Sequence, residues 1–335
     1  MTNDTSDPVA LEAKFERNMH LLPGFADGPR AEPGWPPLDS AAALDRARGC
    51  LLGLAVGEAI GSAAEYLPRG GFPELTGMTG GGPLQLAPGE WTDGTAMALC
   101  LGQSLVASGG LDQYDFMSHL QAWLTNGANT VNGQSLAVGD TTRAAIESFI
   151  HDDDPSAGSV EGAAAGNGSL IRLAPLAILC ATDSDKARFW SSKQSRATHG
   201  TMECLDAGEL FTAQLVDALA GADKAAATRP RLMQLAPNTL AINGGEWKHK
   251  TREQIRSSAY VIDTLEAALW SVWNSDNFRD AVLLAANLGG DAAGVAAVAG
   301  QLAGALYGAS SIPPEWLQTL AWRDKIEQLA ADLVR

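Results

Sequence analysis

Hydrophobic residues recur at helical spacing along most of the chain, whereas the alternation expected of half-buried strands is nearly absent. Ser40 is placed to cap a first run that reaches Ala63 and is apolar nearly all round, which is typical of a buried helix. Further helices are expected over residues 95–107, 111–125, 141–149, 169–180, 204–220, 255–274, 276–287 and 291–308. The pattern therefore predicts an all-α fold in one compact helical domain.

The first 40 residues differ from the rest. Leu11, Phe15 and Met19 recur every four residues and form a short apolar stripe. Residues 23–37 then contain five prolines and three glycines, which excludes a regular helix or strand. We interpret this part as a short helix on a Pro/Gly-rich tether, which would serve either to bind a partner or to pack on the body of the protein. The expected division is an extension over residues 1–40 and a domain over residues 41–335.

Small residues are abundant and form patterns of their own. Gly53, Gly57 and Gly61 are four residues apart within the first predicted helix, so they share one face and would permit close contact with another helix.

The cysteines are far apart, form no CxxC pair, and lie in apolar surroundings; they are Cys50, Cys100, Cys180 and Cys204. They indicate buried free thiols in a reducing compartment.

The formal net charge of −16 makes nucleic acid an unexpected partner, because an acidic surface repels phosphate backbones. It would suit a cationic protein or substrate, although solubility alone also accounts for it. The N-terminus has neither a basic nor an apolar signal-peptide region, and no uncharged apolar run reaches about 18 residues. We therefore expect a cytoplasmic protein without a membrane span.

Four polar clusters lie where a Gly-rich loop opens a predicted helix or within a Gly-rich helix. They are Gly53 to Gly61 with Glu58 inside, Glu90 to Thr95, Gly166 to Ser169, and Asn287 to Gly294. Free N–H groups at a helix start suit phosphates, and carboxylates or hydroxyls there are the hard oxygen ligands that magnesium prefers. Simpler explanations stand beside this one. Thr92, Asp93 and Asp291 would serve as N-caps, the glycines as packing positions, and Asn167 as part of a turn.

The chain resembles the ADP-ribosylglycohydrolases, the family of the dinitrogenase reductase-activating glycohydrolase and the ADP-ribosylarginine hydrolases. The resemblance runs from about Asp45 to Trp316 and rests on six ordered blocks. These are GCLLGLAVGEAIG, GEWTDGTAMALCL, GNGSLIRLAPLAI, Thr198-His199-Gly200, SSAYVIDTLEAALW and GGDAAGVAAVAGQLAGALYG. It implies an orthogonal helical bundle with a central cleft.

The resemblance also implies a chemistry, namely cleavage of the N-glycosidic bond between ADP-ribose and protein arginine with two magnesium ions. By position, Thr92, Asp93 and Asp291 match metal ligands, and Glu58, Asp93 and Asp291 are the expected catalytic carboxylates. The residues expected to bind the ADP-ribose substrate are Asn167, Gly168, Ser169 and His199.

Three of six expected ligand side chains are missing, because the family pattern has Asp, Asp and Thr where this chain has Gly94, Ala293 and Gly294. Glu58 stands where the pattern has a shorter Asp. Asp93 and Asp291 together neutralise about one divalent ion, so we expect one magnesium ion or none.

Three functions follow from the resemblance and its gaps. The first is an ADP-ribosyl-arginine hydrolase that is weakened or inactive. The second is an immunity-type protein that neutralises an ADP-ribosyltransferase toxin by binding it through the N-terminal extension. The third is a pseudoenzyme that binds ADP-ribose without turnover. The sequence alone does not distinguish natural loss of these ligand residues from their deliberate replacement.

Overall fold

The computed structural model describes residues 39–334 and is all-α over this range, with isolated bridges and no strand. The α-helices are α2 Ser40–Gly61, α3 Asp93–Ser108, α4 Gln113–Asn126, α5 Asp140–Asp152, α6 Gly168–Ile171, α7 Ala174–Leu179, α8 Ser184–Arg196, α9 Met202–Leu219, α10 Lys224–Ala227, α11 Pro237–Gly244, α12 Val261–Trp273, α13 Phe278–Ala286, α14 Ala292–Tyr307, α15 Pro314–Thr319 and α16 Arg323–Val334. The predicted fold class is confirmed. The expected extension lies outside the described residues, apart from Asp39 and Ser40.

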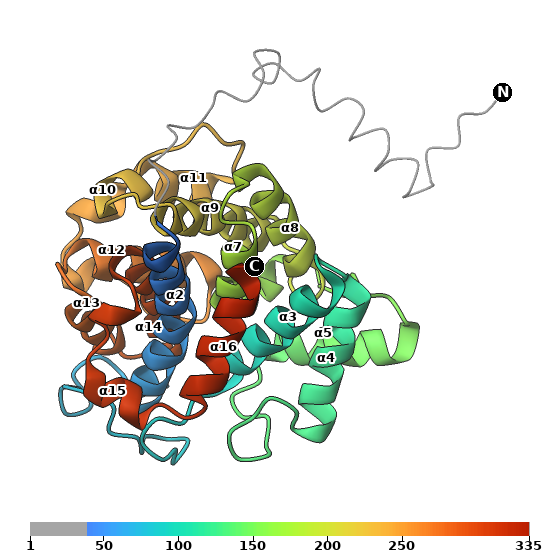
Figure 1. Cartoon of the computed structure of the whole chain (residues 1–335), viewed down its shortest axis with the longest axis horizontal. Coiled ribbons are helices and arrows are strands. Elements are labelled where there is room, and N and C mark those ends of the chain that lie inside the picture. The colour runs from blue at the N-terminus through green and yellow to red at the C-terminus, as the bar shows by residue number, and fades with distance from the viewer. Residues whose placement is uncertain (1–38, 335) are drawn as a thin grey trace. The chain divides into compact units, whose positions relative to one another are not determined.

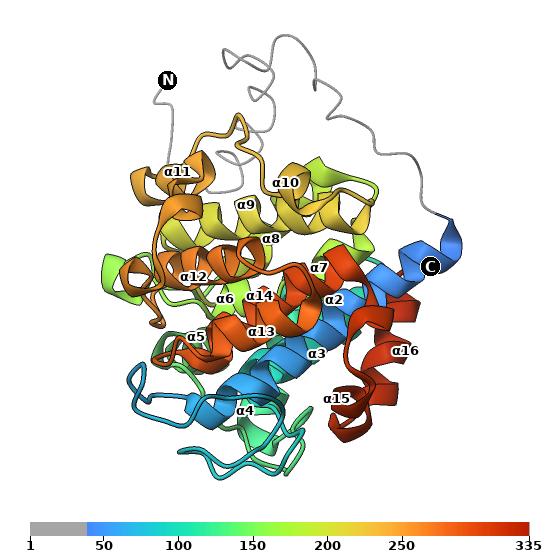
Figure 2. The same cartoon turned by 90° about the vertical axis from the view of Figure 1, so that its left-hand side faces the viewer.

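The central pair of helices is α2 and α14, which run side by side in Figures 1 and 2. Their backbones touch through small residues in antiparallel register. A Cβ atom at Gly53 or Gly57 would overlap the carbonyl oxygen of Gly300 or Ala296. The expectation that the glycines of α2 permit a close helix contact is therefore confirmed. Because the register is antiparallel, the C-terminal end of α2 lies beside the N-terminal end of α14.

Other helices cover this pair in layers. Helices α12 and α13 pack on α14, α16 packs on α2, and α9 contacts α14 from the side where α8 lies. Helices α3, α4 and α5 follow one another at the other side of the molecule in Figure 1. The four cysteines are free and buried, as expected.

Several predicted helix boundaries are wrong. Asp39, not Ser40, caps α2 by accepting a hydrogen bond from the backbone N–H of Ala42. The helix expected over residues 169–180 is broken into α6 and α7. Pro175 has no N–H to donate to the carbonyl of Ile171, which accepts from the Gln301 side chain instead. The helix expected from residue 255 begins only at Val261.

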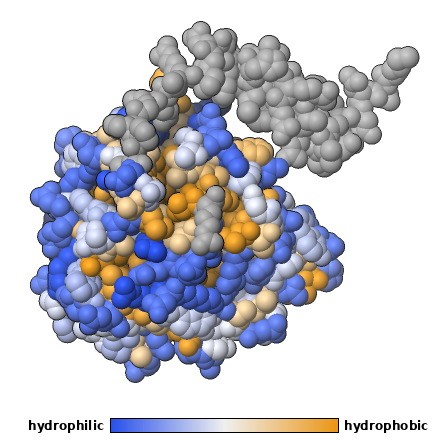
Figure 3. Space-filling view, viewed as in Figure 1, coloured by the Kyte–Doolittle hydropathy of each residue, from blue (hydrophilic) through white to orange (hydrophobic). Residues whose placement is uncertain are grey.

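Hydrophilic residues cover most of the rim of the face shown in Figure 3. This agrees with a chain in which acidic residues outnumber basic ones by 39 to 23. None of the helices within residues 39–334 is both long enough and apolar enough to cross a membrane.

Candidate functional site

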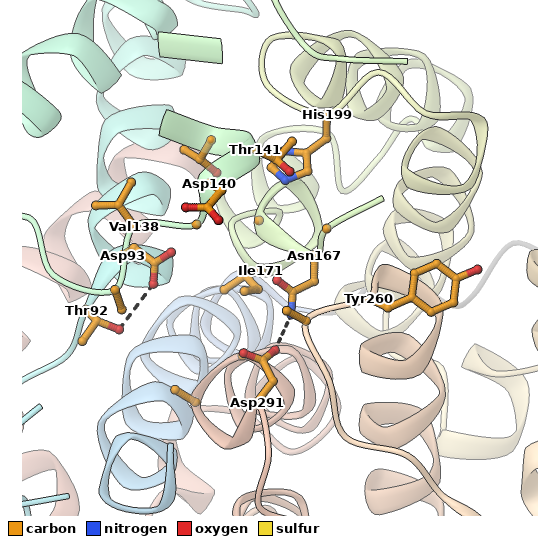
Figure 4. A pocket seen from close by; sticks show the side chains of 18 of the residues that line it. Thr92, Asp93, Val138, Asp140, Thr141, Asn167, Ile171, His199, Tyr260 and Asp291 are labelled. Atoms are coloured by element: carbon orange, nitrogen blue, oxygen red, sulfur yellow. Dashed lines mark hydrogen bonds between the residues drawn. The ribbon is translucent and has the colours of Figure 1, made fainter. Parts of the chain in front are cut away.

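The four polar clusters singled out in the sequence meet at one cavity of about 580 Å³. The starts of α3, α5, α6 and α14 and the segment after α2 open onto it. Figure 4 shows Asp93 and Asp291 entering from α3 and α14, with Asn167 and His199 on other walls. The expected site residues that line the cavity are Glu58, Thr92, Asp93, Asn167, Gly168, His199 and Asp291. Ser169 is not among the lining residues; its hydroxyl accepts a hydrogen bond from Ser195.

The Glu58 carboxylate caps the N-terminus of α3. It accepts hydrogen bonds from the backbone N–H groups of Gly94 (2.7 Å) and Thr95 (2.8 Å) and from the hydroxyls of Thr92 (2.9 Å) and Thr95 (2.5 Å). A buried negative charge is stabilised at this point because the first N–H groups of a helix have no partner within it. Thr92 occupies the N-cap position but makes no capping bond itself. Glu58 is therefore held by the protein at both of its oxygens.

The same carboxylate fills the space beside Gly94. A Cβ atom at position 94 would lie 2.8 Å from Oε1 of Glu58 and would overlap the Cγ2 methyl of Ile171. An aspartate at position 94 would therefore need Glu58 and Ile171 to move. The longer side chain at position 58 and the absent side chain at position 94 are geometrically complementary.

Asp291 shows the same relation to Gly294. It stands at the N-cap position of α14 without making a capping bond, and its Oδ2 accepts from Nδ2 of Asn167 at 2.5 Å. A Cβ atom at position 294 would overlap that Oδ2 and lie 3.0 Å from Nδ2 of Asn167. Asn167 also donates to Thr264, so its amide is fixed between α12 and α14. The N-cap explanations for Thr92 and Asp291 are thus wrong.

Glu65 is a buried carboxyl of the site that we did not predict. It follows α2, is 4% exposed, and its Oε2 accepts from the backbone N–H of Ala293 at 2.8 Å. Burial and the neighbouring charge of Asp291 raise the pKa of Glu65 to about 9. Glu65 lies beyond the end of α2, so helical spacing from Glu58 gave no signal for it. At neutral pH Glu65 is protonated and can act as a hydrogen-bond and proton donor.

The other two acids of this wall are also hard to ionise. Burial, followed by the charges of Glu58 and Asp291, raises the pKa of Asp93 well above its usual range. Burial also raises the pKa of Asp291. Asp140, which we did not predict either, adds a fifth carboxyl, and no lysine or arginine is among the lining residues of the described chain. A protonated carboxyl beside ionisable ones can supply a proton to a leaving group.

The wall formed by Asn167, Gly168 and His199 carries no charged side chain. Burial and the nearby Arg172 charge lower the pKa of His199 to about 3, so its imidazole is uncharged. Gly168 has no room for a side chain, because a Cβ atom would lie 2.8 Å from Cε1 of His199 and 3.0 Å from the Thr142 hydroxyl. A ligand can approach the backbone closely here.

The family model described as ADP-ribosylglycohydrolase matches residues 39–335, which include every cluster of the cavity. The chain belongs to the ADP-ribosylglycohydrolase family. Members of this family act on ADP-ribosylated proteins and use metal ions.

Three proteins illustrate what the ADP-ribosylglycohydrolase chain is similar to. It is 49% identical to the ADP-ribosylarginine hydrolase Tri1 of Pseudomonas putida (strain GB-1), over 98% of this chain and 95% of that protein. It is 35% identical to the ADP-ribosyl-[dinitrogen reductase] glycohydrolase of Rhodospirillum rubrum, over 82% of this chain and 90% of that protein. A solved structure of an ADP-ribosylglycohydrolase-related protein complex superposes with a TM-score of 0.78 at 40% identity, covering 88% of this chain and 99% of that chain.

The donors present do not form a metal site as they are arranged. In the described part of the chain, no group of three or more His, Cys, Asp or Glu side chains is placed to hold a metal ion. Glu58 and Asp291 lie against Gly94 and Gly294 and accept hydrogen bonds from protein donors. The residues therefore do not fit a pair of metals held by side chains at 92–94 and 291–294.

Proposed function

We propose that the cavity binds the ADP-ribosyl-arginine group of a modified protein, and that this chain cleaves its N-glycosidic bond slowly at best. One observation carries the proposal. The cavity is open and lined by donors on one wall, while on the other wall two retained carboxylates occupy the space of missing ligand side chains. Binding groups are present, whereas the ligand set that would activate the bond is incomplete.

The nucleotide side is served by uncharged donors. His199 and the backbone N–H of Gly168, at the start of α6, would donate to phosphate and ribose oxygens. The backbone N–H groups of Gly166 and Asn167 already donate to the carbonyls of Ala164 and Ala259. The raised pKa of Glu65 supports binding of an anion, because a protonated carboxyl repels a diphosphate less than an ionised one does.

The acidic wall of the cavity would bind the guanidinium group of the modified arginine. Asp93 lines the cavity, and its Oδ1 lies 3.4 Å from the Thr92 hydroxyl. A guanidinium bound nearby would favour the ionised form of Asp93 and so oppose the upward shift of its pKa. A guanidinium carries a delocalised charge and several N–H donors that match a carboxylate. The modified arginine would thus bring the positive charge that the lining residues lack.

Slow turnover follows from the hydrogen bonds of Glu58 and Asp291. Each carboxylate is already held by protein donors. Gly94, Ala293 and Gly294 contribute no side-chain oxygen. Metal ligation and charge stabilisation are each worth several kcal/mol in enzymes that rely on them, so an incomplete set reduces the rate by orders of magnitude.

Two measurements on purified protein test the proposal. Calorimetric titration with ADP-ribose should show binding that weakens about tenfold or more in His199→Ala. His151→Ala, at an exposed histidine on α5, should bind as the unchanged protein does. Release of ADP-ribose from an arginine-modified protein should be slow with or without magnesium. If ADP-ribose does not bind, the proposed binding function is wrong. If ADP-ribose is released fast, the proposed slow turnover is wrong.

A second candidate is the immunity-type function, and the extent of the similarity favours it. The match to the Pseudomonas putida Tri1 covers 98% of 335 residues, so at most about seven residues are left out and most of residues 1–38 are included. The Tri1 of Serratia proteamaculans (strain 568) is 44% identical, over 98% of this chain and 91% of that protein. The Rhodospirillum rubrum relative covers only 82% of the chain. The extension is thus a feature that this chain shares with the two Tri1 proteins.

Deletion of residues 1–38 tests this candidate. The full chain should inhibit an arginine-specific bacterial ADP-ribosyltransferase in a buffer with EDTA, where metal-dependent hydrolysis is excluded. The shortened chain should melt at the same temperature and fail to inhibit. Equal inhibition by both chains, or by neither, would count against a toxin-binding extension.

A further inference from the structure

A buried chain of hydrogen bonds leads from Arg172 to His199. Nη2 of Arg172 donates to the Thr198 hydroxyl at 2.8 Å, and that oxygen lies 2.8 Å from Nδ1 of His199. Arg172 and Thr198 are fully buried, and His199 is 2% exposed. Arg172 lies at the C-terminal end of α6, and the other two residues connect α8 to α9.

The donor and acceptor groups allow only one orientation of these hydrogen bonds. A guanidinium can only donate, so the Thr198 oxygen is an acceptor toward Arg172. The single hydroxyl proton of Thr198 then has one acceptor within reach in the described structure, Nδ1 of His199. The reverse arrangement would leave a buried hydroxyl proton without an acceptor, which is costly. Nδ1 is therefore unprotonated, and the imidazole proton is on Nε2.

Arg172 is held firmly enough to impose this direction. Its Nε donates to Oε1 of Gln194 at 2.8 Å, and its Nη2 also donates to the Gln194 carbonyl at 2.9 Å. Its guanidinium carbon lies 4.9 Å from the centre of the Phe116 ring. The side chain is thus fixed by α8 and α4 independently of any ligand.

The Nε2 atom of His199 faces the cavity. Cβ atoms at Gly166 and Gly168, two lining residues, would each lie 3.3 Å from it. Within residues 39–334 no protein group is hydrogen-bonded to Nε2. A protonated Nε2 at this place is an uncharged donor that is available to a ligand.

We propose that Arg172 and Thr198 are positioning residues that set the tautomer of His199, so that its Nε2–H is presented to an acceptor oxygen of the bound ligand. The identity of that ligand rests on the proposed function, whereas the tautomer does not. The opposite tautomer would present a lone pair, which repels phosphate oxygens. A cationic imidazolium would pair with the carboxylates of the facing wall instead.

Nitrogen NMR of the full chain reads the tautomer directly, because protonated and unprotonated imidazole nitrogens have well-separated ¹⁵N shifts. His199→Gln identifies the signal among five histidines. His151 is an internal reference, since its Nδ1 lies 2.6 Å from the Asp152 carboxylate and is expected to be protonated. The His199 signal should show an unprotonated Nδ1 and a protonated Nε2 without any ligand. A protonated Nδ1 on His199 would overturn the proposal.

Substitution of Thr198 tests the cause. Thr198→Val removes the hydroxyl at nearly constant shape, and Thr198→Ser retains it. The valine variant should show mixed tautomers and bind ADP-ribose about fivefold to tenfold more weakly, while the serine variant should match the unchanged protein in both. An unchanged tautomer in the valine variant would overturn the role of Thr198. If the valine variant does not fold, the spectra of the wild-type protein and the serine variant still show which tautomer His199 adopts. A correct tautomer without ADP-ribose binding would contradict the proposed function alone.

Discussion

The α2–α14 contact and the cavity at one end of it share the same two helices but tolerate change differently. Along the contact, a Cβ atom at any glycine of α2 would overlap a backbone carbonyl of α14, so not even alanine fits at these positions. At the cavity, the space beside Gly94 and Gly294 is filled by the ends of flexible carboxylate side chains. Backbone atoms cannot move aside locally, whereas side-chain ends can.

This contrast indicates that the fold does not depend on the ligand side chains of its family. The packing of α2 on α14 positions Glu58, Glu65 and Asp291 through contacts between protein atoms. Loss of ligands then changes the chemistry of the cavity and leaves the helices in place. Substitutions in the α2–α14 contact should therefore differ in the size and kind of their effects from substitutions in the cavity.

The largest expected effect lies in the helix contact. Gly57→Ala places a Cβ against the Ala296 carbonyl, so we expect destabilisation of more than about 4 kcal/mol or failure to fold. Gly244→Ala is the matched control, because Gly244 is also helical but a Cβ atom there would have no neighbouring atom within 4 Å. It should change the free energy of unfolding by no more than about 0.5 kcal/mol. Equal melting curves for both variants would show that the contact is looser than described.

A smaller effect is expected at Gly94. Gly94→Asp forces Glu58 and Ile171 to move and should destabilise the protein by about 1–3 kcal/mol. Adding Glu58→Asp and Ile171→Leu, which shorten or redirect the two obstructing side chains, should recover most of that loss. Denaturant unfolding of the single and combined variants measures the coupling. Additive effects would contradict the complementarity of positions 58 and 94.

The metal-free protein should lose stability as the pH rises. The folded pKa of Glu65 is about 9, above its unfolded value, so folding binds a proton. That contribution is complete below about pH 4.5 and declines as the pH rises toward 9. Urea unfolding in EDTA should show a decrease on the order of 1–3 kcal/mol between pH 7.5 and pH 9, a range above the unfolded pKa of histidine in which His199 adds little slope. Glu65→Gln, which mimics the protonated acid, should flatten this slope; an unchanged slope would assign it to other groups.

Much of the architecture could be predicted from sequence because its signals are local. The glycine spacing in α2 and the apolar runs of α9 and α14 indicate helices packed on all sides. Helix α8 gave no such signal, since its buried face is Ala187, Ser191, Gln194 and Ser195 rather than apolar residues. That face is polar because it binds Arg172 and Ser169.

The site was predictable in its location and not in its bonding. Motif positions indicated that Thr92, Asp93 and Asp291 belong together, and they line one cavity. The cap formed by Glu58 on α3 joins residues 36 positions apart, and the relay through Thr198 needs Arg172, 26 positions away. Neither partner can be read from spacing alone, because the contacts arise from helix packing. The functional roles of these residues stay predictions.

We expect turnover to be slow because the carboxylates of Glu58 and Asp291 fill the space left by missing ligand side chains. Restoring those side chains is the decisive test of this explanation. The measurement is magnesium-dependent release of ADP-ribose from an arginine-modified protein. It compares the unchanged chain with Gly94→Asp/Ala293→Asp/Gly294→Thr and with the same variant carrying Glu58→Asp. We expect little gain in the triple variant, in which Glu58 still obstructs position 94. We expect a gain of about 100-fold or more in the quadruple variant. An unchanged chain that is already as fast as the quadruple variant would contradict this explanation.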